Sequence, residues 1–129
     1  MTLPPRPRIL LVDDDELLRR TFARILVAKF DVVEAGNGRE ALEILSTAEF
    51  DAVVTDLEMP LLGGDEIVGW LEANRPSLAQ RVVVVTGGAK RVAQVEWLRT
   101  VDMARVLRKP CSAGELVAAV DGALRRGEP

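Results

Sequence analysis

Six side chains that could take part in phosphoryl chemistry stand at or just after the ends of short apolar runs in this 129-residue chain. They are Asp13, Asp14, Asp15, Asp56, Thr86 and Lys109. Two like charges ~4 Å apart cost about 4 kcal/mol at an effective dielectric of ~20, so packed carboxylates need a cation or raised pKa values. Mg²⁺ prefers oxygen ligands and is usually held by one or two carboxylates, waters and phosphate oxygens. These residue types therefore indicate a Mg²⁺-dependent phosphoryl site.

Phosphoryl transfer to a carboxylate is the reaction that these groups suit best. The reaction needs positive charge and hydrogen-bond donors around the phosphoryl oxygens, which Mg²⁺, Lys109 and the Thr86 hydroxyl could supply together. Asp56 can act as the nucleophile, because a carboxylate can form an acyl phosphate. A single aspartate at such a place is more often a helix cap, and Asp15, directly before a helical segment, fits a cap better than a ligand. The coincidence of these groups at successive run ends favours a functional site.

The composition argues against several other kinds of site. The chain has no His and a single cysteine, Cys111, so zinc clusters, Ser/His or Cys/His catalytic pairs and an internal disulfide are not expected. A net charge of −3 does not suit a nucleic-acid-binding surface. The apolar run at residues 9–12 ends in three aspartates, which excludes a signal peptide or membrane span there. We expect a cytoplasmic protein without direct nucleic-acid or membrane contact.

Five apolar runs rich in Val, Ile and Leu alternate with amphipathic segments. These runs, which have the composition of buried parallel strands, are residues 8–12, 31–35, 52–55, 81–85 and 104–107. Five strands that alternate with five helices predict an open, doubly wound parallel α/β sheet, because right-handed crossovers place the helices on the sheet faces. Ligands bind such sheets beyond the carboxyl ends of the strands.

Helix punctuation divides the rest of the chain into five helices. Asn37 with Glu40, and Ser112 with Glu115, have the spacing of a capping box and mark the starts of the second and fifth helices. The third helix must end near residue 75, because Pro76 disfavours helical geometry in the residue before it. The fourth has only sparse apolar positions, Val92, Val95 and Leu98, and the flexible pair Gly87-Gly88 before it leaves its start undefined. We expect one domain at residues 8–126, an N-terminal extension at 1–7 and a C-terminal tail at 127–129.

The chain resembles the receiver domain of bacterial response regulators over nearly all of its length. The motifs are Ile-Leu-Leu-Val-Asp-Asp-Asp at 9–15, Thr-Asp-Leu-Glu-Met-Pro at 55–60, Val-Val-Thr-Gly-Gly-Ala at 84–89 and Lys-Pro at 109–110. The resemblance implies a flavodoxin-like three-layer sandwich with strand order 2-1-3-4-5. It also implies a site in which Asp56 is the phosphoacceptor and Thr86 and Lys109 contact the phosphoryl oxygens. Mg²⁺ would be bound by Asp14, Asp56 and the Glu58 backbone carbonyl, with Asp13 acting through water.

The resemblance also implies a setting in a two-component phosphorelay. The phosphoryl donor would be a histidine on a histidine kinase or a histidine phosphotransfer protein, which fits a chain without His. The receiver would not be an enzyme, apart from assisting its own phosphorylation and dephosphorylation, and it would switch a downstream effector protein. Homodimer formation stays open. The Thr-Gly-Gly-Ala stretch resembles receivers at the ends of hybrid histidine kinases, so a free regulator and a part of such a kinase are both open.

One residue departs from the pattern of the family. Val106 stands where many receivers carry Tyr or Phe three residues before the lysine, so the usual coupling of an aromatic rotamer to the threonine cannot operate. We hypothesise that phosphorylation instead reorders the Gly87-Gly88 loop and the helix after it. For the tryptophans we expect Trp97 to be half-buried and Trp70 to be exposed.

Three alternative functions share some of these features. A haloacid-dehalogenase-like Mg²⁺-dependent phosphatase would match Asp13-x-Asp15, but Leu17 stands where that family has Thr or Val, and the chain is too short for a cap. A flavodoxin-like FMN binder would share the sheet, but three carboxylates after the first strand would repel the phosphate. The third alternative is a receiver-like interaction module that is not phosphorylated.

Overall fold

The computed structural model describes residues 5–127. Residues 1–4 of the expected extension and 128–129 of the expected tail lie outside the described residues, so the domain boundaries stay a prediction. Within residues 5–127, five parallel strands form one sheet in the order β2-β1-β3-β4-β5, as predicted. The strands are β1 Arg8–Val12, β2 Asp31–Ala35, β3 Ala52–Asp56, β4 Val82–Thr86 and β5 Val106–Arg108. The last strand starts two residues later than expected, because Met103–Arg105 form a short 3₁₀ helix, η1.

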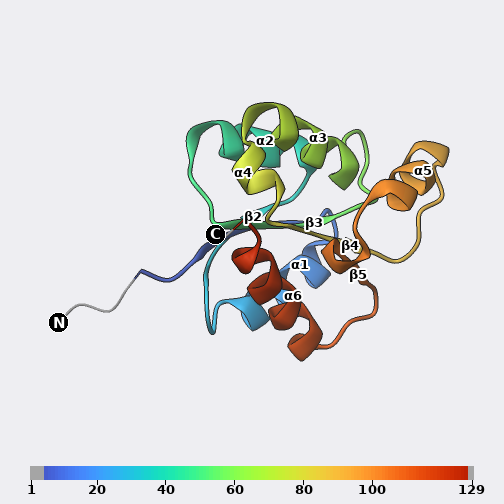
Figure 1. Cartoon of the computed structure of the whole chain (residues 1–129). Helices are drawn as coiled ribbons and strands as arrows, with labels where there is room; N and C mark the ends of the chain where they lie inside the picture. The colour runs from blue at the N-terminus through green and yellow to red at the C-terminus, as the bar shows by residue number, and fades with distance from the viewer. Residues whose placement is uncertain (1–4, 128–129) are drawn as a thin grey trace.

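Helices lie on both faces of this sheet (Figure 1). They are α1 Glu16–Leu26, α2 Gly38–Thr47, α3 Gly64–Asn74, α4 Pro76–Ala79, α5 Val92–Thr100 and α6 Ala113–Arg125. In Figure 1, α2, α3 and α4 lie above the sheet and α1 and α6 below it, while α5 lies toward the β4–β5 edge. The predicted three-layer sandwich is confirmed.

The predicted number of helices was wrong by one. Among residues 5–127 there are six α-helices besides η1, where the sequence predicted five. The additional helix is α4, a single turn that begins at Pro76 directly after α3 has ended at Asn74. In the sequence, Pro76 predicts the end of a helix at the residue before it. A proline is also favoured at the first helical position, since the N–H that it lacks would have no partner there, and burial of Leu78 and Ala79 holds the turn in place.

The strands contribute alternate residues to two apolar cores. Leu10 and Val12 of β1 pack with α2 and α3 on one face, whereas Ile9 and Leu11 pack with α1 and α6 on the other. This period of two follows from the pleat of a strand. All four residues are at most 1% exposed. A strand that is buried on both faces has a continuous apolar sequence, which is why the runs could be recognised.

Most of the local predictions for the helices hold. Ser112 and Glu115 form both bonds of the capping box at the start of α6. Asn37 caps α2 by accepting from the Glu40 N–H at 2.8 Å, but the Glu40 side chain does not return the bond to Asn37. Trp97 is half-buried as expected, and Trp70 is also half-buried against the core, so its expected exposure was wrong.

Candidate functional site

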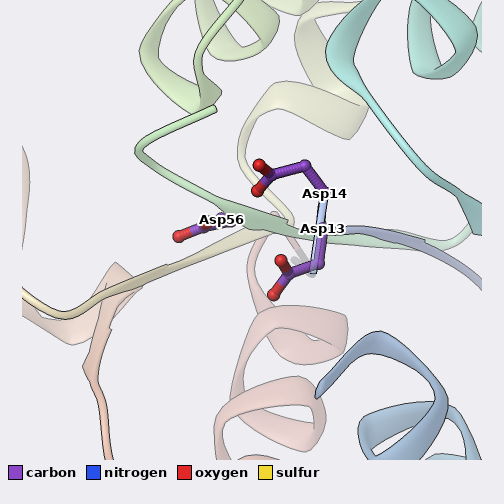
Figure 2. Close-up of side chains that lie close together, drawn as sticks. All are labelled: Asp13, Asp14 and Asp56. Carbon is purple, nitrogen blue, oxygen red and sulfur yellow. The ribbon is translucent and has the colours of Figure 1, made fainter. Parts of the chain in front are cut away.

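Three carboxylates meet at the carboxyl edge of the sheet (Figure 2). Asp13 and Asp14 directly follow β1, and Asp56 is the last residue of β3. Because β1 and β3 are neighbours in register, their ends bring one ligand atom of each aspartate within 4.8 Å of the others. Asp13 is 2% exposed and Asp56 is 7% exposed, while Asp14 is open to solvent. The sequence correctly predicted this cluster.

Lys109 brings a positive charge to the two buried carboxylates. Its Nζ lies 3.3 Å from Asp56 Oδ1 and 3.6 Å from Asp13 Oδ2. The backbone N–H of Lys109 donates to the Thr86 carbonyl at 2.8 Å, which holds the start of the β5–α6 loop against the end of β4. One lysine therefore contacts two of the three carboxylates in the cluster.

Burial dominates the pKa shifts of the two buried carboxylates. It raises the pKa of Asp56 to about 6, although the attraction of Lys109 acts in the opposite direction and the negative charge of Asp13 adds to the rise. Burial also raises the pKa of Asp13. For Lys109, burial lowers the pKa, but the attraction of Asp56 and Asp13 outweighs it and the net direction is upward. One ammonium thus does not compensate the burial of the carboxylates, and a further cation would stabilise their charged forms.

Thr86 ends the strand between β3 and β5. It is 2% exposed, and its hydroxyl oxygen accepts a hydrogen bond from the Gly88 N–H at 3.0 Å. Because a hydroxyl can accept and donate at the same time, the Thr86 proton remains free for an anion at this edge. The structure therefore brings Thr86 to the predicted edge of the sheet.

The other two acidic residues have different surroundings. Asp15 caps α1 by accepting from the Leu18 N–H at 3.1 Å, which confirms the prediction that it is a cap. Its own N–H donates to Asp13 Oδ1 at 2.9 Å and so orients that carboxylate. Glu58 lies half-buried in the β3–α3 loop, and the role of its carbonyl stays a prediction.

Two supporting contacts were not predicted. Arg19 donates to the Asp13 carbonyl at 2.9 Å and pairs with Glu34 at 3.0 Å, which holds the backbone at the end of β1. At Gly64, a Cβ atom would lie 2.5 Å from the Asp56 carbonyl oxygen, so the loop after Asp56 returns very close to it. The Gly63-Gly64 pair was a sequence signal for this close approach, whereas an arginine in an amphipathic helix carries none.

The donor set fits a hard divalent cation such as Mg²⁺. Three carboxylates offer oxygen atoms alone, and in the part of the chain that the structure describes this is the one cluster of three such residues able to hold a metal. No helix within residues 5–127 is long and apolar enough to cross a membrane.

Comparison with known proteins identifies the family. The model of the response regulator receiver domain matches residues 9–121. Response regulator MprA of Mycolicibacterium vanbaalenii is 35% identical over 124 residues, which cover 95% of this chain and 52% of that protein. Sensor histidine kinase TmoS of Ectopseudomonas mendocina is 30% identical over 115 residues, which cover 89% of this chain and 12% of that kinase. The signal receiver domain of an HD domain-containing protein from Pseudomonas fluorescens has 25% identity and a TM-score of 0.82, with coverage of 97% of this chain and 91% of that one.

The match concerns one domain of these relatives. The chain spans about half the length of the response regulator, at 52%, and a much smaller part of the kinase. Residues 9–121 include all the aspartates of the cluster together with Thr86 and Lys109. The chain therefore belongs to the response regulator receiver domain family, the signal-receiving modules of two-component systems.

Proposed function

We propose that Asp56 accepts a phosphoryl group from a phosphohistidine of a partner protein in a Mg²⁺-dependent reaction. The main support is the pairing of the buried Asp56 carboxylate with Lys109 Nζ at 3.3 Å, beside two further carboxylates within 4.8 Å. The ion would be held by Asp14, Asp56 and the Glu58 carbonyl, with Asp13 acting through water. When bound, it supplies positive charge that offsets the charge of the phosphoryl oxygens.

Asp56, Lys109 and Thr86 would have separate roles in this reaction. An oxygen of Asp56 attacks the phosphorus, the P–N bond to the donor histidine breaks, and the imidazole leaves with the electron pair of that bond. Lys109 and the free proton of Thr86 donate to the equatorial oxygens as they move from donor to acceptor. The Gly88 N–H holds the Thr86 oxygen at 3.0 Å, and this bond limits the directions in which the hydroxyl can donate.

The proposal includes a setting for the reaction. Receiver domains interact with histidine kinases and effector proteins, and two of the relatives are named as a response regulator and a sensor histidine kinase. We propose that a histidine kinase or a histidine phosphotransfer protein is the donor, that an effector protein reads the phosphorylated state, and that this takes place in the cytoplasm. The chain would not itself be an enzyme, and its Asp56 acyl phosphate would carry the signal.

Two contacts argue against a haloacid-dehalogenase-like phosphatase. Such a site would need Asp13 and Asp15 to face the ion together, but Asp15 Oδ1 accepts from the Leu18 N–H at the start of α1. Lys109 also contacts Asp56 more closely than Asp13, at 3.3 Å against 3.6 Å. Both contacts favour Asp56 as the group that reacts.

Intact mass spectrometry with a small acyl phosphate donor and Mg²⁺ tests the proposal. We expect the wild-type chain to gain the mass of one phosphoryl group and Asp56→Asn to gain none, because an amide cannot form the acyl phosphate. Asp31→Asn is the matched control, since Asp31 is an exposed aspartate at the other end of the sheet, and it should be labelled like the wild type.

Addition of a chelator should abolish labelling of the wild type. If Asp56→Asn still gained one phosphoryl group to the same extent, another residue would be the acceptor and the proposal would fail.

A further inference from the structure

The side chain of Gln94 is buried in a helix that is otherwise half-buried or exposed. Within residues 5–127, Gln94 is 2% exposed, and it is the one residue of α5 classed as buried. Its Nε2 donates to the Leu57 carbonyl at 2.8 Å and lies 3.3 Å from Asp65 Oδ1. Leu57 is the residue directly after Asp56. The amide group of Gln94 therefore connects α5 to the loop that directly follows Asp56, the proposed phosphoacceptor.

The amide lies in a niche formed by the backbone of that loop. A Cβ atom at Gly63 would lie 2.6 Å from Gln94 Nε2, so the glycine leaves the space that the amide fills. The Leu57 carbonyl also accepts from the Gly64 N–H at 2.9 Å. Gln94 thus lies against both the beginning and the end of the loop 57–63.

The contacts fix the orientation of the amide and leave one of its two ends without a partner. Both partners of Nε2 are acceptors, so the NH₂ end must face them. The other end, Oε1, is buried without a donor among the described residues, which destabilises the arrangement. Leucine would fill a similar volume without an unpaired acceptor, and the Leu57 carbonyl would keep its bond from Gly64. A purely structural role therefore does not require glutamine here.

We propose that Gln94 is a positioning residue, whose amide holds the loop that carries Glu58 and thereby couples the occupied phosphorylation site to α5. This inference depends on the proposed function, since it assigns the route by which that site signals. Glu58, whose carbonyl we propose as a ligand of the ion, is next in the chain to Leu57. A shift of the loop on phosphorylation reaches α5 through the 2.8 Å bond. The route does not involve position 106, where valine replaces the aromatic residue common in the family.

Amide hydrogen exchange tests the coupling in the full chain with a small acyl phosphate donor and Mg²⁺. In the wild type we expect exchange over residues 92–100 to change on phosphorylation. In Gln94→Leu and Gln94→Met, which keep the size but cannot donate, that change should fall at least threefold while Asp56 is still labelled. The Mg²⁺ concentration for half-maximal labelling should rise about 2- to 10-fold, the equivalent of one neutral hydrogen bond. Gln80→Leu, an exposed glutamine in the loop after α4, is the control and should behave like the wild type.

Several results would overturn the inference. One is an unchanged α5 response and Mg²⁺ dependence in either folded Gln94 variant, and another is a phosphorylated wild type without any change at 92–100. If neither variant folds, the side-chain NH₂ signals of Gln94 in the NMR spectrum of the wild type decide, since they must shift on phosphorylation. Absence of labelling in the wild type would instead show that the proposed function has failed.

Discussion

Asp56→Asn should stabilise the metal-free protein above pH 6, although it removes the proposed phosphoacceptor. Burial raises the pKa of Asp56 from 3.8 to about 6 in the folded state, against the attraction of Lys109. Between these two values the folded state binds more protons than the unfolded state, so the free energy of unfolding falls as the pH rises through this window. Above pH 6 the free energy of unfolding of the wild type is lowered by the full effect of this pKa difference, and below pH 3.8 it is not lowered.

The size of the effect follows from the shift in pKa. A difference of roughly two units, at 1.36 kcal/mol per unit, corresponds to about 3 kcal/mol. Asparagine keeps the shape of the side chain without the charge, but the change removes the closest partner of Lys109, which retains Asp13 at 3.6 Å. We therefore expect Asp56→Asn to be more stable than the wild type by about 1–3 kcal/mol at pH 8 and equally stable at pH 3.5.

Urea unfolding of both proteins in the presence of a chelator, over a pH series from 3.5 to 8, measures this difference. Added Mg²⁺ should then narrow it, because an ion that binds the folded state stabilises the wild type by about 2.7 kcal/mol at 100 times its Kd. If Asp56→Asn were less stable than the wild type at pH 8 without metal, Lys109 would already compensate for burial. The site would then not need a further cation.

Two further substitutions test the proposed metal ligand Asp14 and the close approach of the loop to Asp56. Asp14→Asn should weaken Mg²⁺ binding about tenfold or more in a calorimetric titration, which is the equivalent of one charge-assisted contact. Because Asp14 is exposed, the free energy of unfolding should stay nearly unchanged. Equal Mg²⁺ affinity in both proteins would show that Asp14 is not a ligand. Gly64→Ala should lower the free energy of unfolding by about 1–3 kcal/mol, since its Cβ would lie 2.5 Å from the Asp56 carbonyl oxygen. Gly69→Ala in the same helix is the control, because its Cβ would meet nothing within 4 Å. This substitution should raise the free energy of unfolding by about 0.5–1 kcal/mol. Equal urea midpoints for the two variants would contradict the close approach at Gly64.

The carboxylate cluster was predictable because it depends on a rule of topology. Asp13 and Asp56 are far apart in the sequence, but each comes at the end of an apolar run. Parallel strands place all such ends at one edge of the sheet, so the alternation of strands and helices was enough to bring the side chains together. The pairing of β1 with β3 then supplies the register. The same rule predicts that Lys109 lies at this edge of the sheet, but it does not predict the distances from Lys109 to the carboxylates.

The contacts made by Gln94 and the helix α4 could not be predicted in this way. A glutamine among sparse apolar positions has the pattern of an exposed helix face, and its burial depends on the Leu57 carbonyl, 37 residues earlier in the chain. The turn at Pro76 depends on whether Leu78 and Ala79 find space in the core. In both cases the deciding interaction is long-range, and no local propensity represents it.

The electrostatics of the site and the contact of Gln94 bear on the same problem, which is how a change at Asp56 reaches the surface. A carboxylate buried beside Asp13 is unfavourable without sufficient positive charge. Binding of the proposed ion and phosphoryl group would therefore change the free energy of the loop that carries the proposed ligand Glu58. This change in the loop can move a helix only if the loop is in contact with that helix. Apart from Gln94, the residues of α5 are half-buried or exposed, and of its apolar side chains Trp97 and Leu98 pack against the core without being fully buried, so the helix is less firmly held than the buried strands. A weakly packed helix held by one polar bond to the loop can therefore respond to the site even though residue 106 is a valine.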